Sequence, residues 1–252
     1  MSWLKKLRSS LLEIRSEENQ KLRLAKRTVL PFDSRPGFGL APAGTWPSRS
    51  RGPSMTNDPD QIARIEAYLN ENLSPARFRH VMGVRETALT LAKRHGVDKA
   101  QAELAALLHD CVKELPDDEL LSLANRHRLQ VDEHEQQTPD LLHGKVAPFV
   151  AAELFGVNDE TVFDAMRRHS TGSVEMGSLD QVLFVADFCE PNRAYTAAAE
   201  VRELAEHDLE AAVLEVMQFK LRKTLLKKQP VHPDSFHAYN ALVDKRIQNR
   251  TD

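Results

Sequence analysis

Six side chains of types that bind metal ions lie in apolar, helix-forming stretches of this sequence: His80, His109, Asp110, His143, His169 and Asp187. Each lies close to a point where apolar residues give way to polar ones, as in LAALLHDC and VLFVADFC. Burying an unpaired carboxylate is costly, so the two aspartates must be paired, protonated or bound to a cation. Because few basic residues are near them in the sequence, cations are the simplest partners. Imidazole and carboxylate ligands without thiolates suit iron, manganese, zinc or cobalt.

The adjacent pair His109 and Asp110 is informative about geometry. Neighbouring residues on a helix point about 100° apart, so both cannot face one ion from an ideal helix. They can do so at a helix end, at a kink, or where Asp110 bridges two ions. Six such ligands suit two ions about 3.5–4 Å apart, as in hydrolytic two-metal sites. A single histidine on an amphipathic helix is more often a hydrogen-bonded core residue, so the prediction depends on the whole set.

The elements that must position these residues are helices. Ser74 and Pro75 are an N-cap followed by a first-turn proline, and the helix they begin runs to His95, with Gly96 as its stop. Asp98 begins a helix that should end near Lys113. Further helices are predicted over 116–127, 138–155, 158–169 (capped by Asn158), 178–189 (capped by Ser178), 196–206, 209–228 and 234–248. We find no strand alternation and no repeat, so the prediction is an all-α helical bundle, one domain over residues 58–250.

The first 54 residues differ from the rest of the chain. They hold 11 Lys+Arg against 4 Asp+Glu, whereas the remaining residues carry a net charge of −10. Residues 31–54 are rich in Pro, Gly, Ser and Arg without a period, which predicts a disordered extension. A basic amphipathic helix near the start could instead lie on a membrane surface, and Met55 could be the start of the folded protein.

The bulk composition excludes several classes of protein. A net charge of −3 over 252 residues gives no electrostatic footprint for nucleic acid. No apolar run is long enough for stable membrane insertion. Two cysteines cannot build a disulfide framework, so a cytoplasmic location is expected. A homodimer is left open.

Five motifs occur in the order found in the HD-domain metal-dependent phosphohydrolases: RFRHVMGV, LAALLHDCVKELP, LLHGKVAP, AMRRHSTG and VLFVADFCEPNR. They resemble specifically the YqeK-type branch, the bacterial symmetrical diadenosine tetraphosphate hydrolases, over roughly residues 60–245. This resemblance implies that the six residues named above are the ligands of two divalent metal ions. It implies that Asp110 bridges, that His143 and His169 complete the second site, and that the metal is iron. The residues alone would equally accept manganese or cobalt.

The resemblance also implies phosphate contacts. Lys113 and Arg193 would neutralise phosphate charge, as catalytic residues beside Asp110, and His143, Thr171 and Gly172 would face the same anion. Structural roles compete with these: a lysine at a helix end offsets the helix dipole, and an arginine after a turn can cap it. Lys145 is a weaker candidate for the phosphate.

Three further residues near the motifs have expected roles beside the ligands. Glu190 is expected beside a ligand histidine. Cys111 and Cys189 are expected to be packing residues.

The reaction implied is hydrolysis of diadenosine tetraphosphate to two ADP by a metal-activated hydroxide. The alternatives are an HD phosphohydrolase or phosphodiesterase acting on another nucleotide, and a non-catalytic regulator that binds nucleotide or metal. Base recognition is open, since the available aromatic residues are few: Phe78, Phe149, Phe188 and Tyr195.

Overall fold

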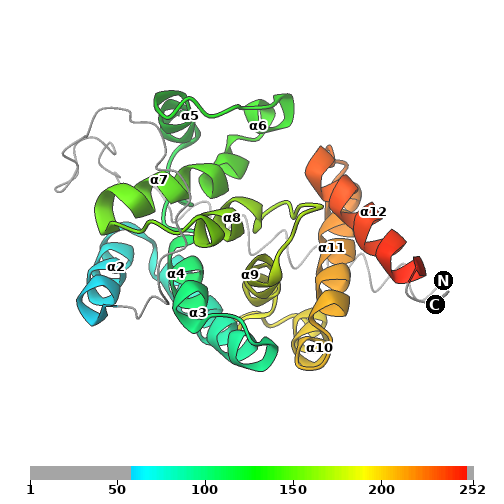
Figure 1. Cartoon of the computed structure of the whole chain (residues 1–252). Coiled ribbons are helices and arrows are strands. Elements are labelled where there is room, and N and C mark those ends of the chain that lie inside the picture. Colours follow the sequence, from blue (N-terminus) through cyan, green and yellow to red (C-terminus); the bar gives the residue numbers. More distant parts are fainter. Residues whose placement is uncertain (1–57, 249–252) are drawn as a thin grey trace. The chain divides into compact units, whose positions relative to one another are not determined.

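The structure, a computed structural model, describes residues 58–248, which form helices joined by turns with no strand among them (Figure 1). In chain order the elements are α2 (Pro59–Asn72), α3 (Pro75–His95), α4 (Lys99–Leu108), α5 (Asp117–Arg126), α6 (Glu133–Gln137), the 3-10 helix η2 (Pro139–Leu142), α7 (His143–Phe155), α8 (Glu160–Arg168), α9 (Ser178–Cys189), α10 (Thr196–Ala205), α11 (Leu209–Leu226) and α12 (Pro233–Gln248). The all-α prediction is therefore confirmed. The predicted disordered extension at 1–54 lies outside the described residues.

The helix ends follow the capping chemistry of the sequence in α3 and α4. The Ser74 hydroxyl accepts a hydrogen bond from a first-turn backbone N–H, and Pro75 occupies the first turn of α3. Gly96 ends α3 in the left-handed region at φ 68°, which glycine adopts without a Cβ penalty. The Asp98 carboxylate accepts from two backbone N–H groups at the start of α4. Both starts lie where the sequence predicts them.

The predicted end of α4 near Lys113 is wrong, because the helix ends at Leu108. In a continuing helix the carbonyl of Ala106 would accept from the backbone N–H of Asp110. Here His109 Nδ1 hydrogen bonds to that carbonyl at 2.7 Å instead. The chain then continues through Leu115 in tighter turns bonded from residue i to residue i−3. His109 and Asp110 thus lie at a helix end, one of the arrangements that lets adjacent residues face one site.

Two other predicted caps are displaced by one residue. The side chain that caps α8 belongs to Asp159 rather than Asn158, and it accepts from two backbone N–H groups of the first turn. The cap position of α9 is Gly177 rather than Ser178, and the Asp180 carboxylate accepts from the Gly177 N–H at 3.0 Å. Since both residues of each pair are common caps, only the backbone conformation decides between them.

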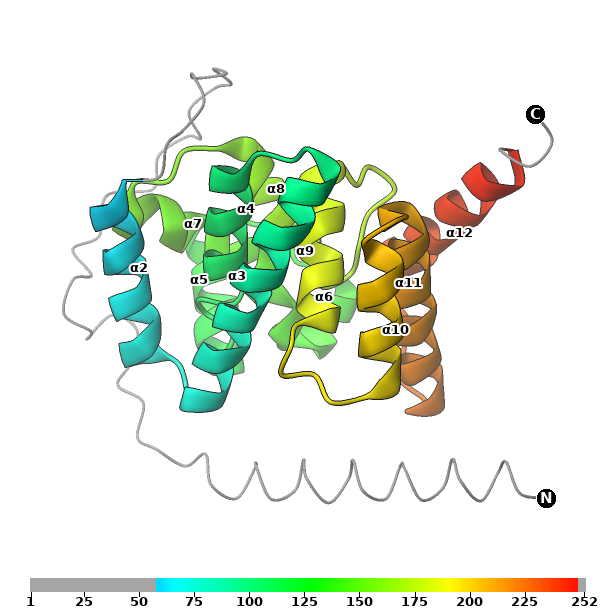
Figure 2. The same ribbon diagram turned by 90° about the horizontal axis from the view of Figure 1, so that it is seen from below.

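Helix α9 is the centre of the packing. Figure 2 shows it between α3 on one side and α10 with α11 on the other, and α8 packs on it as well. Almost every α9 side chain is buried, including Phe184 and the run from Val182 to Ala186. Each fully buried Leu or Phe contributes about 1.5–3 kcal/mol, which fixes α9 and the helices around it. Of these helices, α3 and α9 contain residues of the candidate site, and α8 has one directly after it.

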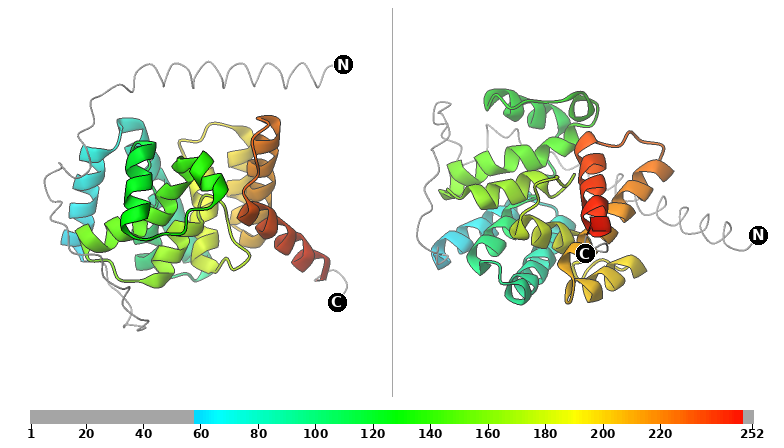
Figure 3. Two further views of the ribbon diagram at one scale, coloured as in Figure 1. Left: turned by 90° about the horizontal axis from the view of Figure 1, so that it is seen from above. Right: turned by 45° about the vertical axis from the view of Figure 1, so that its right-hand side comes forward.

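The N-terminal end of α12 lies close to α6, far from it in the sequence, as Figure 1 and the right view of Figure 3 show. Just before α12, His232 Nε2 is 3.1 Å from a carboxylate oxygen of Asp132, which caps α6. The His232 and His134 rings are 5.8 Å apart. The Ser235 hydroxyl in α12 also donates to the Thr171 carbonyl at 2.8 Å, which joins α12 to the turn that follows α8.

No helix of residues 58–248 is long and apolar enough to cross a bilayer.

Candidate metal centre

The structure brings the six predicted ligands together from five different helices or their ends. His80 lies within α3, and His143 is the first residue of α7. The other four are His109 and Asp110 directly after α4, His169 directly after α8, and Asp187 near the end of α9. Four of these side chains and Asp110 are buried, and Asp187 is 17% exposed.

Asp110 lies at the middle of the cluster, and its two oxygens face different histidines. Oδ2 is 3.7 Å from His80 Nε2 and 3.5 Å from His109 Nε2. Oδ1 is 3.3 Å from His143 Nε2 and 3.6 Å from His169 Nε2. The histidines therefore form two pairs, one on each carboxylate oxygen, as a bridging carboxylate requires.

The other ring nitrogen of these histidines has its own hydrogen-bond acceptor. In three of them Nδ1 bonds to the backbone carbonyl three residues earlier: His109 to Ala106 at 2.7 Å, His169 to Met166 at 2.7 Å, and His143 to Asp140. A carbonyl only accepts, so Nδ1 carries the proton and, in the neutral ring, Nε2 presents a lone pair. Each of these side chains is thereby oriented with its lone pair toward Asp110.

His80 is held by a side chain instead. Its Nδ1 is 3.2 Å from Glu190 Oε1, and the other Glu190 oxygen accepts from the backbone and side-chain N–H groups of Asn192. Glu190 reaches α3 at Gly83, where a Cβ would overlap Glu190 Oε2. Glu190 therefore lies beside a candidate ligand histidine, His80, as the sequence predicts.

The cluster around Asp110 fits divalent cations, because the Nε2 atoms of its four histidines have no hydrogen-bond donor to accept from or face another lone pair. Among the described residues, the buried Nε2 atoms of His80 and His109 have no hydrogen-bond partner. The Nε2 atoms of His143 and His169 face each other at 3.0 Å, although neither carries a proton in the tautomer described above. Two lone pairs so placed repel unless a cation binds both. His80, His109 and Asp110 form one group with metal-ligand spacing, and Asp110, His143 and His169 form another.

The protonation states of Asp110, Asp187 and His169 also suit cation binding. Burial works against ionisation of Asp110 and Asp187, but the neighbouring histidines outweigh it and hold the pKa of both carboxyls well below the usual value. Burial lowers the pKa of His169 to about 4. Burial also disfavours the charged form of His109, but Asp110 outweighs it and raises the pKa of His109. A cation bound there displaces a proton.

The two predicted phosphate contacts lie at the edge of the cluster. Lys113 Nζ is 2.7 Å from an Asp140 carboxylate oxygen and 3.3 Å from His143 Nδ1. The Arg193 guanidinium is 3.7 Å from Asp187 Oδ1, and its side chain is 37% exposed. The Lys113 and Arg193 side chains therefore lie beside the candidate metal ligands, where a bound molecule can contact them.

Three polar residues at the site were missed in the sequence. Arg77 donates to Asp110 Oδ2 at 2.9 Å; it lies three residues before His80 on one helix face, a signal that was present. Ser170 Oγ is 3.2 Å from His143 Nε2 and 3.1 Å from His169 Nε2. Lys220 donates to the His169 carbonyl at 3.0 Å, and it comes from α11 with no local signal.

The weaker candidates have structural contacts. Thr171 donates to the carbonyl of Gly172, which has a φ of 74°. Lys145 pairs with Glu135 at 2.6 Å. Cys111 and Cys189 are buried, and burial raises the pKa of the Cys189 thiol to about 12, as packing residues require.

The four candidate aromatic residues are placed differently. Phe149 stacks on His127 at 4.2 Å, and Phe78 is half-buried. Phe188 is buried and meets Tyr195 edge-on at 5.4 Å. Tyr195 is 37% exposed. None of these contacts identifies a binding site for the nucleobase of a substrate.

Comparison with known proteins gives a consistent result. The sequence profile of the HD domain matches residues 77–192. The chain is 38% identical over 177 residues to the symmetrical bis(5'-nucleosyl)-tetraphosphatase of Bacillus subtilis (strain 168), covering 70% of this chain and 95% of that protein. It is 36% identical over 172 residues to the protein of the same name from Halalkalibacterium halodurans, covering 68% of this chain and 91% of that one.

A solved structure from Clostridium acetobutylicum, described as a predicted HD superfamily hydrolase involved in NAD metabolism, superposes with a TM-score of 0.71 at 30% identity. The match covers 73% of this chain and 97% of that one.

Proposed function

Because the chain belongs to the HD-domain family of symmetrical bis(5'-nucleosyl)-tetraphosphatases, we propose that it hydrolyses diadenosine tetraphosphate to two molecules of ADP at a two-metal centre. The observation that carries the proposal is the division of four imidazoles between the two oxygens of Asp110. We assign His80, His109, Asp110 and Asp187 to one metal and Asp110, His143 and His169 to the other. The donors suit iron, manganese or cobalt, and iron is the first choice because of the family resemblance.

Two divalent ions bound at these residues would supply a water deprotonated near neutral pH and Lewis acidity toward the phosphate. The chain's own residues hold the reactants. Lys113 lies beside His143 and Arg193 beside Asp187, and their charges would neutralise the phosphate oxygens. Arg77, 28% exposed beside Asp110, could reach the same anion. The hydroxyls of Ser170 and Thr171 are further donors. No protein nucleophile is required.

Lys220 is a positioning residue in this proposal. It donates to the carbonyls of His169 at 3.0 Å and Ser170 at 3.4 Å, and its ammonium lies over the Phe184 ring at 4.1 Å. It is also 3.9 Å from Asp187. It therefore links α11 to the turn that carries His169.

The test is turnover of diadenosine tetraphosphate by purified protein loaded with iron or manganese, with products separated by chromatography. Two ADP per substrate support the proposal, whereas AMP with ATP would contradict symmetrical cleavage. Turnover only of other nucleotides would favour an HD phosphohydrolase or phosphodiesterase of different substrate. Nucleotide binding without product would favour a regulator. The two free, buried cysteines support action in the reducing cytoplasm.

A further inference from the structure

Tyr195 is the exposed member of the four candidate aromatic residues. It lies in the connection between α9 and α10 (Figure 2) and is 37% exposed, whereas Phe188 is buried and Phe78 and Phe149 are half-buried. The Tyr195 and Phe219 rings are stacked, with centroids 5.6 Å apart and an angle of 13° between their planes. Phe219 thus covers part of the Tyr195 ring, and the exposed part is available to a second planar group.

The Tyr195 ring is held in a fixed position. Its hydroxyl donates to the Phe188 carbonyl at 2.8 Å, and the Phe188 ring meets it edge-on at 5.4 Å. Burial raises the pKa of Tyr195 to about 12, so the hydroxyl keeps its proton and this hydrogen bond at neutral pH. A ring that is already fixed loses little conformational entropy when a ligand packs on it.

Tyr195 lies on the side of the candidate metal centre where Arg193 would meet phosphate. Phe188, whose carbonyl holds the Tyr195 hydroxyl, directly follows the candidate ligand Asp187 in α9. The Arg193 guanidinium is 3.7 Å from Asp187 Oδ1, and the charges of both residues act on the Tyr195 hydroxyl. A candidate metal ligand, a cation and an exposed aromatic ring therefore lie close together within residues 187–195.

This combination of groups suits a nucleotide. The cation and the metal centre are partners for phosphate oxygens, and the exposed ring is a partner for a planar base. Every nucleobase has a π face, so an aromatic side chain can bind it without reading its hydrogen-bonding groups. An inorganic phosphate would make no use of the ring, and a purely apolar ligand would make no use of Arg193.

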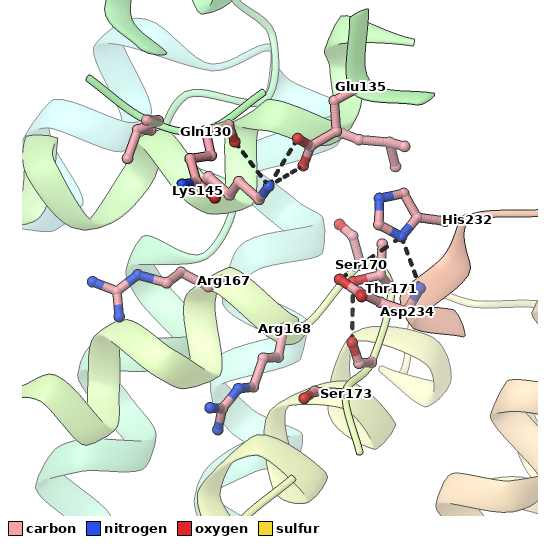
Figure 4. A pocket seen from close by; sticks show the side chains of 13 residues that line it. Gln130, Glu135, Lys145, Arg167, Arg168, Ser170, Thr171, Ser173, His232 and Asp234 are labelled. Carbon is pink, nitrogen blue, oxygen red and sulfur yellow. Dashed lines mark hydrogen bonds and ion pairs between the residues drawn. The ribbon is translucent and has the colours of Figure 1, made fainter. Parts of the chain in front are cut away.

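The cavity that opens beside the centre lacks an aromatic surface of this kind. It has a volume of about 320 Å³ and is lined by three segments, within residues 129–145, 167–173 and 232–234. Its labelled side chains carry hydroxyl, amide, carboxylate, imidazole or basic groups (Figure 4). Of the residues that the structure describes, no phenylalanine, tyrosine or tryptophan lines it. The cavity therefore offers a base less than Tyr195 does.

We propose that Tyr195 is a stacking surface for one nucleobase of the dinucleoside polyphosphate, whose nearest phosphates lie at Arg193 and the metal centre. The inference rests on the proposed function. Because stacking makes no use of the hydrogen-bonding edge of the base, this surface should accept guanine as readily as adenine. Tyr195 then favours nucleotides over phosphate compounds without a base and does not select among bases.

The test is calorimetric binding of two ligands to the manganese-loaded full chain: ADP, and ribose 5-diphosphate, which lacks the base. The measured quantity is the ratio of the two dissociation constants, since losses of folding or of metal weaken both ligands alike. Tyr195→Ala should weaken ADP about tenfold and leave ribose 5-diphosphate within about twofold of wild type, as expected for one lost base–aromatic stack. Tyr195→Leu, which keeps Phe219 covered but has no flat ring, should do the same. Tyr195→Phe, which keeps the ring, should retain most of the ADP affinity.

Phe236→Ala is the matched control, because Phe236 is an aromatic side chain on α12 that is 53% exposed and lies outside the proposed stacking site. It should leave the ratio unchanged, and a change equal to that of Tyr195→Ala would overturn the proposal. A wild-type ratio in both Tyr195→Ala and Tyr195→Leu would also overturn it.

Two further outcomes contradict the stacking role. Equal weakening of both ligands would mean that Tyr195 only positions Arg193, and equal binding of ADP and ribose 5-diphosphate by the wild type would mean that no base is bound. Absence of any diadenosine tetraphosphate turnover by the wild type would instead contradict the proposed function itself, because the binding measurement requires no turnover.

Discussion

Two groups of histidine and carboxylate side chains in this protein have the spacing of metal ligands, and they differ in how their hydrogen bonds are used. In the centre around Asp110, three histidines donate Nδ1–H to a backbone carbonyl, so their Nε2 lone pairs converge. In the group of Asp132, Glu135 and His232, the imidazole Nδ1 accepts a backbone N–H, so Nε2 carries the proton.

The carboxylates differ in the same way. Asp132 and Glu135 form a capping box at the start of α6, and Glu135 also pairs with Lys145. Asp110 instead faces four imidazoles and Arg77. Proximity therefore identifies candidate metal ligands in both regions. The hydrogen bonds made by the imidazole Nδ1 atoms and by the carboxylates decide which group can bind a cation.

The largest expected effect comes from the aspartate of each group. Asp110→Ala should abolish both turnover of diadenosine tetraphosphate and metal loading, since it removes the carboxylate shared by both pairs of histidines. Asp132→Asn should retain two ions per chain and near-normal turnover. Metal analysis by mass spectrometry together with the kinetic assay checks both. Metal retention by the Asp110 variant would remove this residue from the site.

Replacing one histidine in each group sharpens the difference. His143→Ala should reduce the content to about one ion per chain, because only the pair on the other Asp110 oxygen remains complete. His232→Ala should keep two ions per chain, since His232 Nε2 carries a proton in the neutral ring and has no lone pair for a metal ion. Equal metal content in these two variants would show that the hydrogen-bond pattern does not distinguish the groups.

A smaller effect is expected from the acceptor behind His80. Glu190→Ala leaves His80 Nδ1 without its 3.2 Å partner. Loss of such a partner typically lowers metal affinity about 10–100-fold. Competition with a chelator measures this affinity. Unchanged affinity would mean that the α3 backbone alone orients the ring.

The smallest effect concerns stability in the second group. Asp132→Ala should lower the free energy of unfolding by about 1 kcal/mol at neutral pH, because it removes an N-cap. Slight burial works against ionisation of Asp132, but the Glu135 N–H and His232 outweigh it and hold its pKa below the usual 3.8. The charge-dependent part of this stabilisation is thus present above about pH 4 and is lost as the pH falls through the folded-state pKa. Urea unfolding at pH 7 and pH 3 tests this: an equal difference at both pH values would show that the charge of Asp132 contributes nothing.

Much of this could be predicted from the sequence, because caps and ordered motifs are local. Ser74, Gly96 and Asp98 mark helix ends by their own chemistry, and the six candidate ligands that the sequence predicts lie together in one cluster. The end of α4 could not be predicted, because it depends on the His109 side chain, whose Nδ1 hydrogen bonds to the Ala106 carbonyl in place of a backbone N–H. Lys220 and the cavity walls come from distant segments that only tertiary packing brings together.

Gly83 affects the candidate metal centre although it contacts neither the metal ligands nor the substrate in this proposal. Any larger residue there would displace the Glu190 carboxylate and, with it, the support of His80. A relative that keeps all six candidate ligands but has alanine or a bulkier residue at this position should therefore bind the metal beside His80 more weakly, by no more than Glu190→Ala does. Inspection of this single α3 position offers a way to recognise members with a weakened metal site that motif matching would not distinguish from the others.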